Sequence, residues 1–159
     1  MIRKAVALTV EAFAPYGTVI EHRGKERRFP VEGVFEAEAT GTTSRVWVTR
    51  ATDAGAWPIV IRQMERHPYS AQTFIPLRGQ PYLVAVCPAQ ADGMPDASRL
   101  EAFVANPHQG VIYRKNTWHH GLTVLGESAE YVVLQMPAAN GKDDVFMTLG
   151  EPVTIEPGG

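Results

Sequence analysis

The sequence predicts an all-β, mainly β-strand fold that closes into a barrel, with one or two short helices. Short runs of β-branched and aromatic residues recur along the chain, and glycines, prolines and polar residues separate them at short intervals. This spacing is typical of β-sandwiches and barrels. Two polar stretches, residues 65–72 and 110–120, lie among these runs and hold three of the five histidines. We therefore expect both stretches to form one small polar site inside the barrel.

Length and charge limit the classes of protein to consider. A chain of 159 residues suits one domain, residues 1–159. The formal net charge of -2 argues against nucleic acid or an anionic membrane as a partner. The apolar part of residues 1–6 is too short for a signal peptide, and no run approaches the roughly 20 apolar residues of a membrane span. We expect a cytoplasmic protein.

The first expected elements are a short helix and a long polar segment. Thr9 can cap a helix over Val10–Phe13, which Pro15 and Gly17 would end. Residues 17–41 are too long for a simple connector, so they contain irregular strands or cover the mouth of the barrel. Their basic cluster is a solvated loop or, if it folds over the site, a binder of an anionic substrate. The cluster comprises Arg23, Lys25, Arg27 and Arg28.

Strands account for most of the remaining chain. Residues 44–50 alternate cleanly, with Val46 and Val48 on one face and Arg45, Trp47 and Thr49 on the other. Residues 89–96 have the composition of a surface loop, and residues 96–105 fit either a short helix or a strand. Further strands are expected over residues 58–65, 72–77, 80–86, 110–113, 121–125 and 131–134.

The two polar stretches have a regular spacing. Glu65, His67 and Gln72 follow a Glu-x-His-x4-Gln-x6-Gly pattern that ends at Gly79, and His119 lies nine residues after Gly110. Residues two apart on a strand face the same side, so Glu65 and His67 should project together. An isolated His67 would more simply be a hydrogen-bonded structural histidine. Two motifs in register favour a functional site instead.

This pattern resembles the two motifs of the cupin superfamily, whose fold is a double-stranded β-barrel or jelly roll. The resemblance implies that Glu65, His67, Gln72 and His119 converge, with oxygen and imidazole donors that suit a divalent metal. Glutamine is a weak neutral ligand, so the sequence leaves open whether a metal binds. Of the neighbouring histidines 119 and 120, only one can face inward, and His120 is expected on the outer face or in a subunit contact.

At the family level, the chain is similar to ureidoglycolate lyases from about Leu8 to Phe146. The similar pieces are residues 8–9, 11–17, 19–20, 64–68, 72, 74–77, 103, 109–111, 113 and 118–120. The resemblance implies release of glyoxylate and urea from (S)-ureidoglycolate in allantoin breakdown, a homodimer, and a possible Ni²⁺ or Mn²⁺ ion. Trp118, in the core or an interface, and Phe146 add apolar surface that favours the dimer.

Several polar positions depart from the family pattern. They are residues 24–27 before the Arg28–Phe29 pair, residues 114–116, Gly121 and the pair Gln135–Met136. These positions would handle a carboxylate and a ureido group. A cupin that acts on another small hydroxy acid, or one that only binds a small carboxylate, therefore remains an alternative.

The implied reaction needs a base for a hydroxyl proton and an acid for a leaving nitrogen. Histidine titrates near neutrality, so His67 and His119 are the candidate catalytic residues, with Glu65 as a second proton carrier. The substrate is a small-molecule carboxylate, which an arginine fork would hold. The candidate substrate-binding residues are Arg28, Arg50, Gln72, Tyr113, Arg114 and Lys115. The single cysteine, Cys87, is expected to be a buried, inert thiol.

Overall fold

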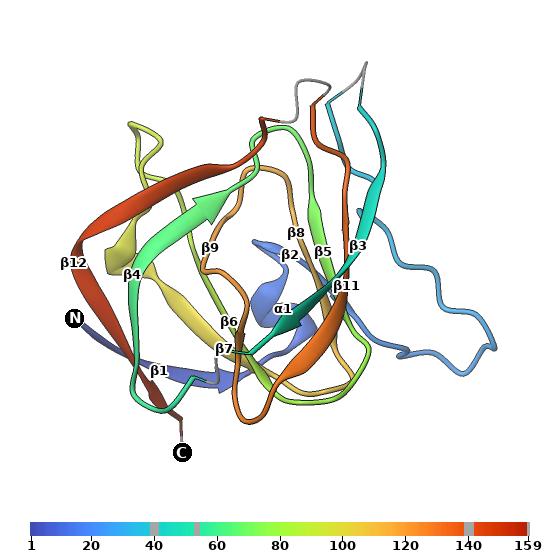
Figure 1. Cartoon of the computed structure of the whole chain (residues 1–159), viewed down its shortest axis with the longest axis horizontal. Coiled ribbons are helices and arrows are strands. Elements are labelled where there is room, and N and C mark those ends of the chain that lie inside the picture. Colours follow the sequence, from blue (N-terminus) through green and yellow to red (C-terminus); the bar gives the residue numbers. More distant parts are fainter. Residues whose placement is uncertain (39–41, 53–54, 139–141, 159) are drawn as a thin grey trace.

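The computed structural model describes residues 1–38, 42–52, 55–138 and 142–158, which form two β-sheets (Figure 1). The larger sheet has seven strands in the order β10 (Thr123–Val124), β6 (Tyr82–Cys87), β7 (Glu101–Ala105), β1 (Ile2–Ala7), β12 (Val145–Pro157), β4 (Ile59–Arg66) and β9 (Trp118–His119). Because β9 also pairs with β6, six of these strands close into a ring. The second sheet has the order β2 (Gly17–Ile20), β8 (Gly110–Tyr113), β5 (Gln72–Pro76), β11 (Ala129–Gln135) and β3 (Arg45–Ala51). The predicted all-β, cupin-like barrel is confirmed.

The helical content is small, as predicted. Helix α1 (Val10–Phe13) begins where the Thr9 side chain accepts a hydrogen bond from Ala12 N at 3.2 Å. Phe13 is fully buried and anchors the helix between the sheets. Gly17 then starts β2 so close to β8 that a Cβ atom would lie 1.8 Å from the Ile112 carbonyl oxygen. Only glycine permits that approach.

Several ambiguous segments are resolved by the structure. Residues 96–105 contain both alternatives, a 3-10 turn η1 (Ala97–Arg99) followed by strand β7. Residues 17–41 begin with β2 and, where described, continue without regular strands, apart from a bridge between Ala37 and Ser70. Because β2 and β3 are opposite edges of the second sheet, this segment passes from one edge to the other (Figure 1).

The longest strand, β12, was not expected from the sequence. Its pairing with β4 shifts register between Thr148 and Val153, around Gly150 and Pro152. This irregularity interrupts the alternation by which a strand is recognised. Strand β12 also pairs in parallel with β1, so the two ends of the chain lie side by side in the ring.

Two apolar cores lie on opposite faces of β6, whose residues are all buried. Leu83, Ala85 and Cys87 belong to a core with members from all six strands of the ring, which therefore fills it. Tyr82, Val84 and Val86 belong to a second core between the sheets. Trp118 is in the ring core, which confirms its predicted core position.

Cys87 is buried in the same core. Burial and the nearby Asp96 carboxylate raise the pKa of its thiol to about 12. The thiol is protonated near neutral pH and inert, as predicted. None of the helices in the described part of the chain is long and apolar enough to cross a membrane.

Candidate active site

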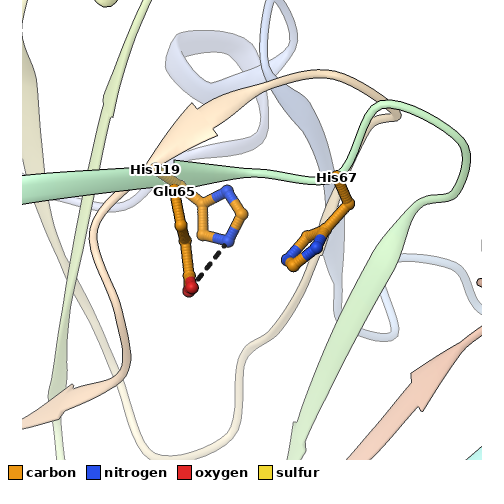
Figure 2. Close-up of side chains that lie close together, drawn as sticks. All are labelled: Glu65, His67 and His119. Atoms are coloured by element: carbon orange, nitrogen blue, oxygen red, sulfur yellow. Dashed lines mark ion pairs between the residues drawn. The ribbon is translucent and has the colours of Figure 1, made fainter. Parts of the chain in front are cut away.

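Strand β4 separates an apolar side chain from a charged one. Met64 points into the ring core, and Glu65, the next residue, faces the second sheet. His67 follows immediately after the strand. Glu65, His67 and His119 each offer one donor atom, and these atoms all lie within 4.8 Å of one another (Figure 2).

His119 is held on three sides. Its strand pairs with β4 so that His119 lies directly opposite Glu65, and its Nε2 is 3.4 Å from Glu65 Oε1. Its Nδ1 lies 2.9 Å from the Thr117 carbonyl oxygen, an acceptor, so the Nδ1 proton is assigned to that bond. The ring stacks on Tyr113 with a centroid separation of 4.0 Å. Nε2 is therefore aimed at Glu65.

His67 presents a free nitrogen to the same site. Its Nδ1 lies 3.2 Å from the Asp143 carbonyl oxygen and 3.0 Å from Asp144 Oδ1, so Nδ1 carries the proton as donor. Its buried Nε2 has no hydrogen-bond partner among the described residues. Burial, reinforced by His119, lowers the pKa of His67 despite the opposing charges of Glu65 and Asp144. His67 is therefore neutral near pH 7 and keeps a lone pair on Nε2.

Glu65 remains ionised in these surroundings. Burial raises the pKa of its carboxyl, but the contact with His119 and the charges of the nearby histidines outweigh burial and lower it. Gln72 Oε1 approaches His119 Nε2 to 3.2 Å from the other sheet. Four side chains thus direct acceptor atoms at one point: Glu65, His67, Gln72 and His119. Because His67 Nε2 has no partner among the described residues, a cation can bind there. The donor set fits either a proton or a divalent metal.

Glu65, His67 and Gln72 line a pocket of about 380 Å³ between the two sheets, and the buried His119 contacts two of them, Glu65 and Gln72. This volume is within the range of small-molecule sites. The lining residues are Arg45, Trp47, Glu65, His67, Gln72, Gln135, Asp144 and Phe146.

Comparison with known proteins agrees with this geometry. The family model described as ureidoglycolate lyase matches residues 1–156. The chain belongs to the ureidoglycolate lyase family. It is 44% identical over 146 residues to a ureidoglycolate lyase of Brucella anthropi, with 86% of this chain and 82% of that protein covered.

Two further relatives of the ureidoglycolate lyase family support the assignment. A ureidoglycolate lyase of Brucella ovis is 42% identical over 136 residues, with 80% of this chain and 78% of that protein covered. One of Chelativorans sp. is 39% identical over 145 residues, with 84% and 85% covered. The family predicted from the sequence is confirmed.

The structure brings together one part of the predicted site. Glu65, His67, Gln72 and His119 meet, with the two histidine ring centroids 5.2 Å apart, and Tyr113 supports His119.

The four cationic residues that were predicted to bind the substrate lie outside the pocket lining. Arg50 is paired with Glu130, Lys115 with Glu38, and Arg114 donates to the carbonyls of Ala14 and Pro15, while Arg28 is exposed on the segment after β2. Substrate contact by these four stays a prediction.

The sequence reasoning missed the opposite wall of the pocket. Arg45 and Trp47 share a face of β3, which alternation had predicted, but nothing in the sequence placed that face beside His67. Asp144 and Phe146 also went unnoticed as site residues because their positions depend on strand pairing. Gln135, noted from the sequence as a departure from the family pattern, lies in the same lining. His120 is half-buried and lines a small recess with Glu65 and Phe146, its Nδ1 being 3.2 Å from the Gln63 carbonyl oxygen.

Proposed function

We propose that this protein is a ureidoglycolate lyase, releasing glyoxylate and urea from (S)-ureidoglycolate. The observation that carries the proposal is the convergence of Glu65, His67 and His119 beside a pocket of small-molecule size, which Glu65 and His67 line. The family match over nearly the whole chain and the names of the relatives supply the substrate.

The reaction requires two proton movements, because the substrate carries a hydroxyl and a urea nitrogen on one carbon. His67 is suited to accept the hydroxyl proton at Nε2, which is unpartnered among the described residues. As the hydroxyl becomes a carbonyl, the C–N bond breaks and the leaving nitrogen needs a proton. A proton held between Glu65 and His119 Nε2 can supply it through Glu65, which lines the pocket, while His119 keeps its proton on Nδ1. After the reaction His67 carries one extra proton and the Glu65–His119 pair lacks one. Transfer of one proton from His67 to the pair restores the starting state.

The same donors are suited to a metal ion such as Ni²⁺ or Mn²⁺. His67 and His119 would hold it through Nε2, Glu65 through its carboxylate, and Gln72 through Oε1. When bound, such an ion supplies positive charge that polarises substrate oxygens and lowers the pKa of the hydroxyl. It would occupy the same lone pairs as the protons, so a bound ion and proton transfer at the two Nε2 atoms exclude each other. Metal binding is therefore measured separately from turnover.

We predict that the purified protein binds one Ni²⁺ or Mn²⁺ per chain and loses it to a chelator. His67→Ala removes a direct ligand and should weaken binding by more than about 10-fold. Equilibrium dialysis with metal analysis measures this without reference to activity. His108→Ala, at an exposed histidine outside the cluster, is the matched control. Equal binding by wild type and His67→Ala would rule out this site as the metal centre.

The function itself is tested by following glyoxylate and urea from (S)-ureidoglycolate, with chelator and with added Ni²⁺ or Mn²⁺. Stoichiometric release of both products is expected. Turnover of another hydroxy acid, with none of ureidoglycolate, would favour a related enzyme. Binding of a carboxylate ligand with no turnover of either substrate would favour the non-catalytic alternative.

A homodimer is also proposed, on a different basis from the one expected. Trp118 is buried in the ring core and leaves no surface for a partner, while Phe146, 54% exposed, lines the pocket. The outward face of the second sheet is the better candidate. There Val48 pairs in register with Val132 and Val132 with Ile75, and Val46 and Val48 are 64% and 59% exposed on the edge strand β3. Such an apolar row favours self-association.

Sedimentation at micromolar concentration should therefore give a dimer, and Val48→Glu should shift it toward monomer. A buried charge without a partner destabilises an interface, so the affinity of the two subunits should fall several-fold or more. Val60→Glu, at an exposed apolar residue on β4, is the control that should leave the dimer unchanged. A wild-type monomer would overturn this proposal.

A further inference from the structure

A row of side chains crosses the second sheet opposite the histidines. Arg45 on β3 pairs in register with Gln135 on β11, Gln135 with Gln72 on β5, and Gln72 with Tyr113 on β8. Residues that are direct cross-strand neighbours point to the same face. The row therefore runs from Tyr113, stacked on His119, through Gln72, which contacts His119, to Arg45 at the edge of the sheet.

Arg45 is the one cationic side chain other than histidine among the described residues that line the pocket. Its guanidinium makes no hydrogen bond or ion pair with any described residue. Arg50, on the same strand but the other face, is instead bound to Glu130 at 2.6 Å. The Arg45 charge is thus free to bind a ligand.

The pocket needs that charge if it is to accept an anion. Glu65 and Asp144 both line it, and a carboxylate entering beside them would be repelled. Neighbouring strands are about 4.8 Å apart, so Arg45 lies about 10 Å along the row from Gln72 at the backbone, and its long side chain shortens that gap. A guanidinium also matches a carboxylate with two parallel hydrogen bonds.

We propose that Arg45 binds the carboxylate of the substrate and so sets the orientation of the reacting carbon over Glu65, His67 and His119. With the carboxylate held at the edge of the sheet, the hydroxyl and the urea nitrogen on the same carbon face the histidines. This inference rests on the proposed function for the identity of the substrate. It assigns to Arg45 a role that Arg28, Arg50, Arg114 and Lys115 had been predicted to fill.

The test measures the kinetics of Arg45→Ala with (S)-ureidoglycolate. Loss of a charged hydrogen-bonding pair should raise KM by about 10- to 100-fold, with a much smaller change in kcat. Arg45→Lys keeps the charge but loses the two parallel hydrogen bonds, so its KM should lie between those of wild type and Arg45→Ala. Arg62→Ala, at an exposed arginine on β4 outside the pocket, should match wild type.

Inhibition by the two products separates carboxylate binding from a structural effect. Glyoxylate carries the carboxylate, so its inhibition constant should rise in Arg45→Ala by the same factor as KM. Urea lacks a carboxylate, so its inhibition constant should stay as in wild type. A KM of Arg45→Ala within two-fold of wild type, or equal changes in the inhibition constants of both products, would overturn the inference. Turnover by wild type would still support the proposed function.

If wild type does not cleave ureidoglycolate, calorimetric titration with glyoxylate still decides the inference. Weaker binding by Arg45→Ala than by wild type and Arg62→Ala would support the anion site. Equal binding by all three would overturn it, independently of the failed function.

Discussion

His119→Ala should lower kcat with (S)-ureidoglycolate by about 10²- to 10⁴-fold, the usual contribution of a general acid–base group. His119 touches every other part of the cluster. It pairs with Glu65 at 3.4 Å, contacts Gln72 at 3.2 Å and stacks on Tyr113. Its removal takes away the nitrogen, Nε2, with which Glu65 can share a proton, and leaves Glu65 without its closest partner. Steady-state kinetics on the purified variant measures the loss.

Two further variants guard this result against a folding artefact. His119→Asn keeps a polar side chain at the buried position and should be as inactive as His119→Ala while retaining the wild-type circular dichroism spectrum. His108→Ala removes an exposed histidine and should keep full activity. Activity of His119→Ala within ten-fold of wild type would exclude His119 from the proton transfers.

Trp118→Ala should reduce the free energy of unfolding by about 3–5 kcal/mol, the usual cost of removing a large aromatic side chain from a core. Trp118 is 1% exposed and fills the ring of six strands. Its indole Nε1 donates to the Gly93 carbonyl oxygen at 3.1 Å, and the Arg66 guanidinium lies over its ring at 4.7 Å. The alanine variant would leave a cavity and an unpaired carbonyl.

Urea denaturation followed by circular dichroism measures this change. Trp118→Phe keeps most of the volume and loses only the indole hydrogen bond, so it should cost clearly less than the alanine variant. Trp47→Ala, at a tryptophan 38% exposed on β3, is the matched control and should change stability least. Equal losses at Trp47 and Trp118 would contradict the assignment of Trp118 to the core.

The local features of this protein follow from short stretches of its sequence. Thr9 and Pro15 bound helix α1, and alternation assigns Arg45 and Trp47 to one face of a strand. The same rule predicted that Glu65 and His67 lie on one side, because side chains alternate along an extended chain and residues two positions apart face the same way. The family followed from combined motifs rather than from any single residue.

Only the tertiary structure decided which strands lie beside one another and in which register. Glu65 faces His119, and Arg45, Gln135 and Gln72 form one row, although these residues are tens of positions apart in the sequence. Register between distant strands is set by packing of the two apolar cores, and a shift of one residue would turn every side chain to the other face. For this reason the sequence identified half of the pocket, the histidines and their carboxylate, and the packing of the sheets supplied the free arginine on its other wall.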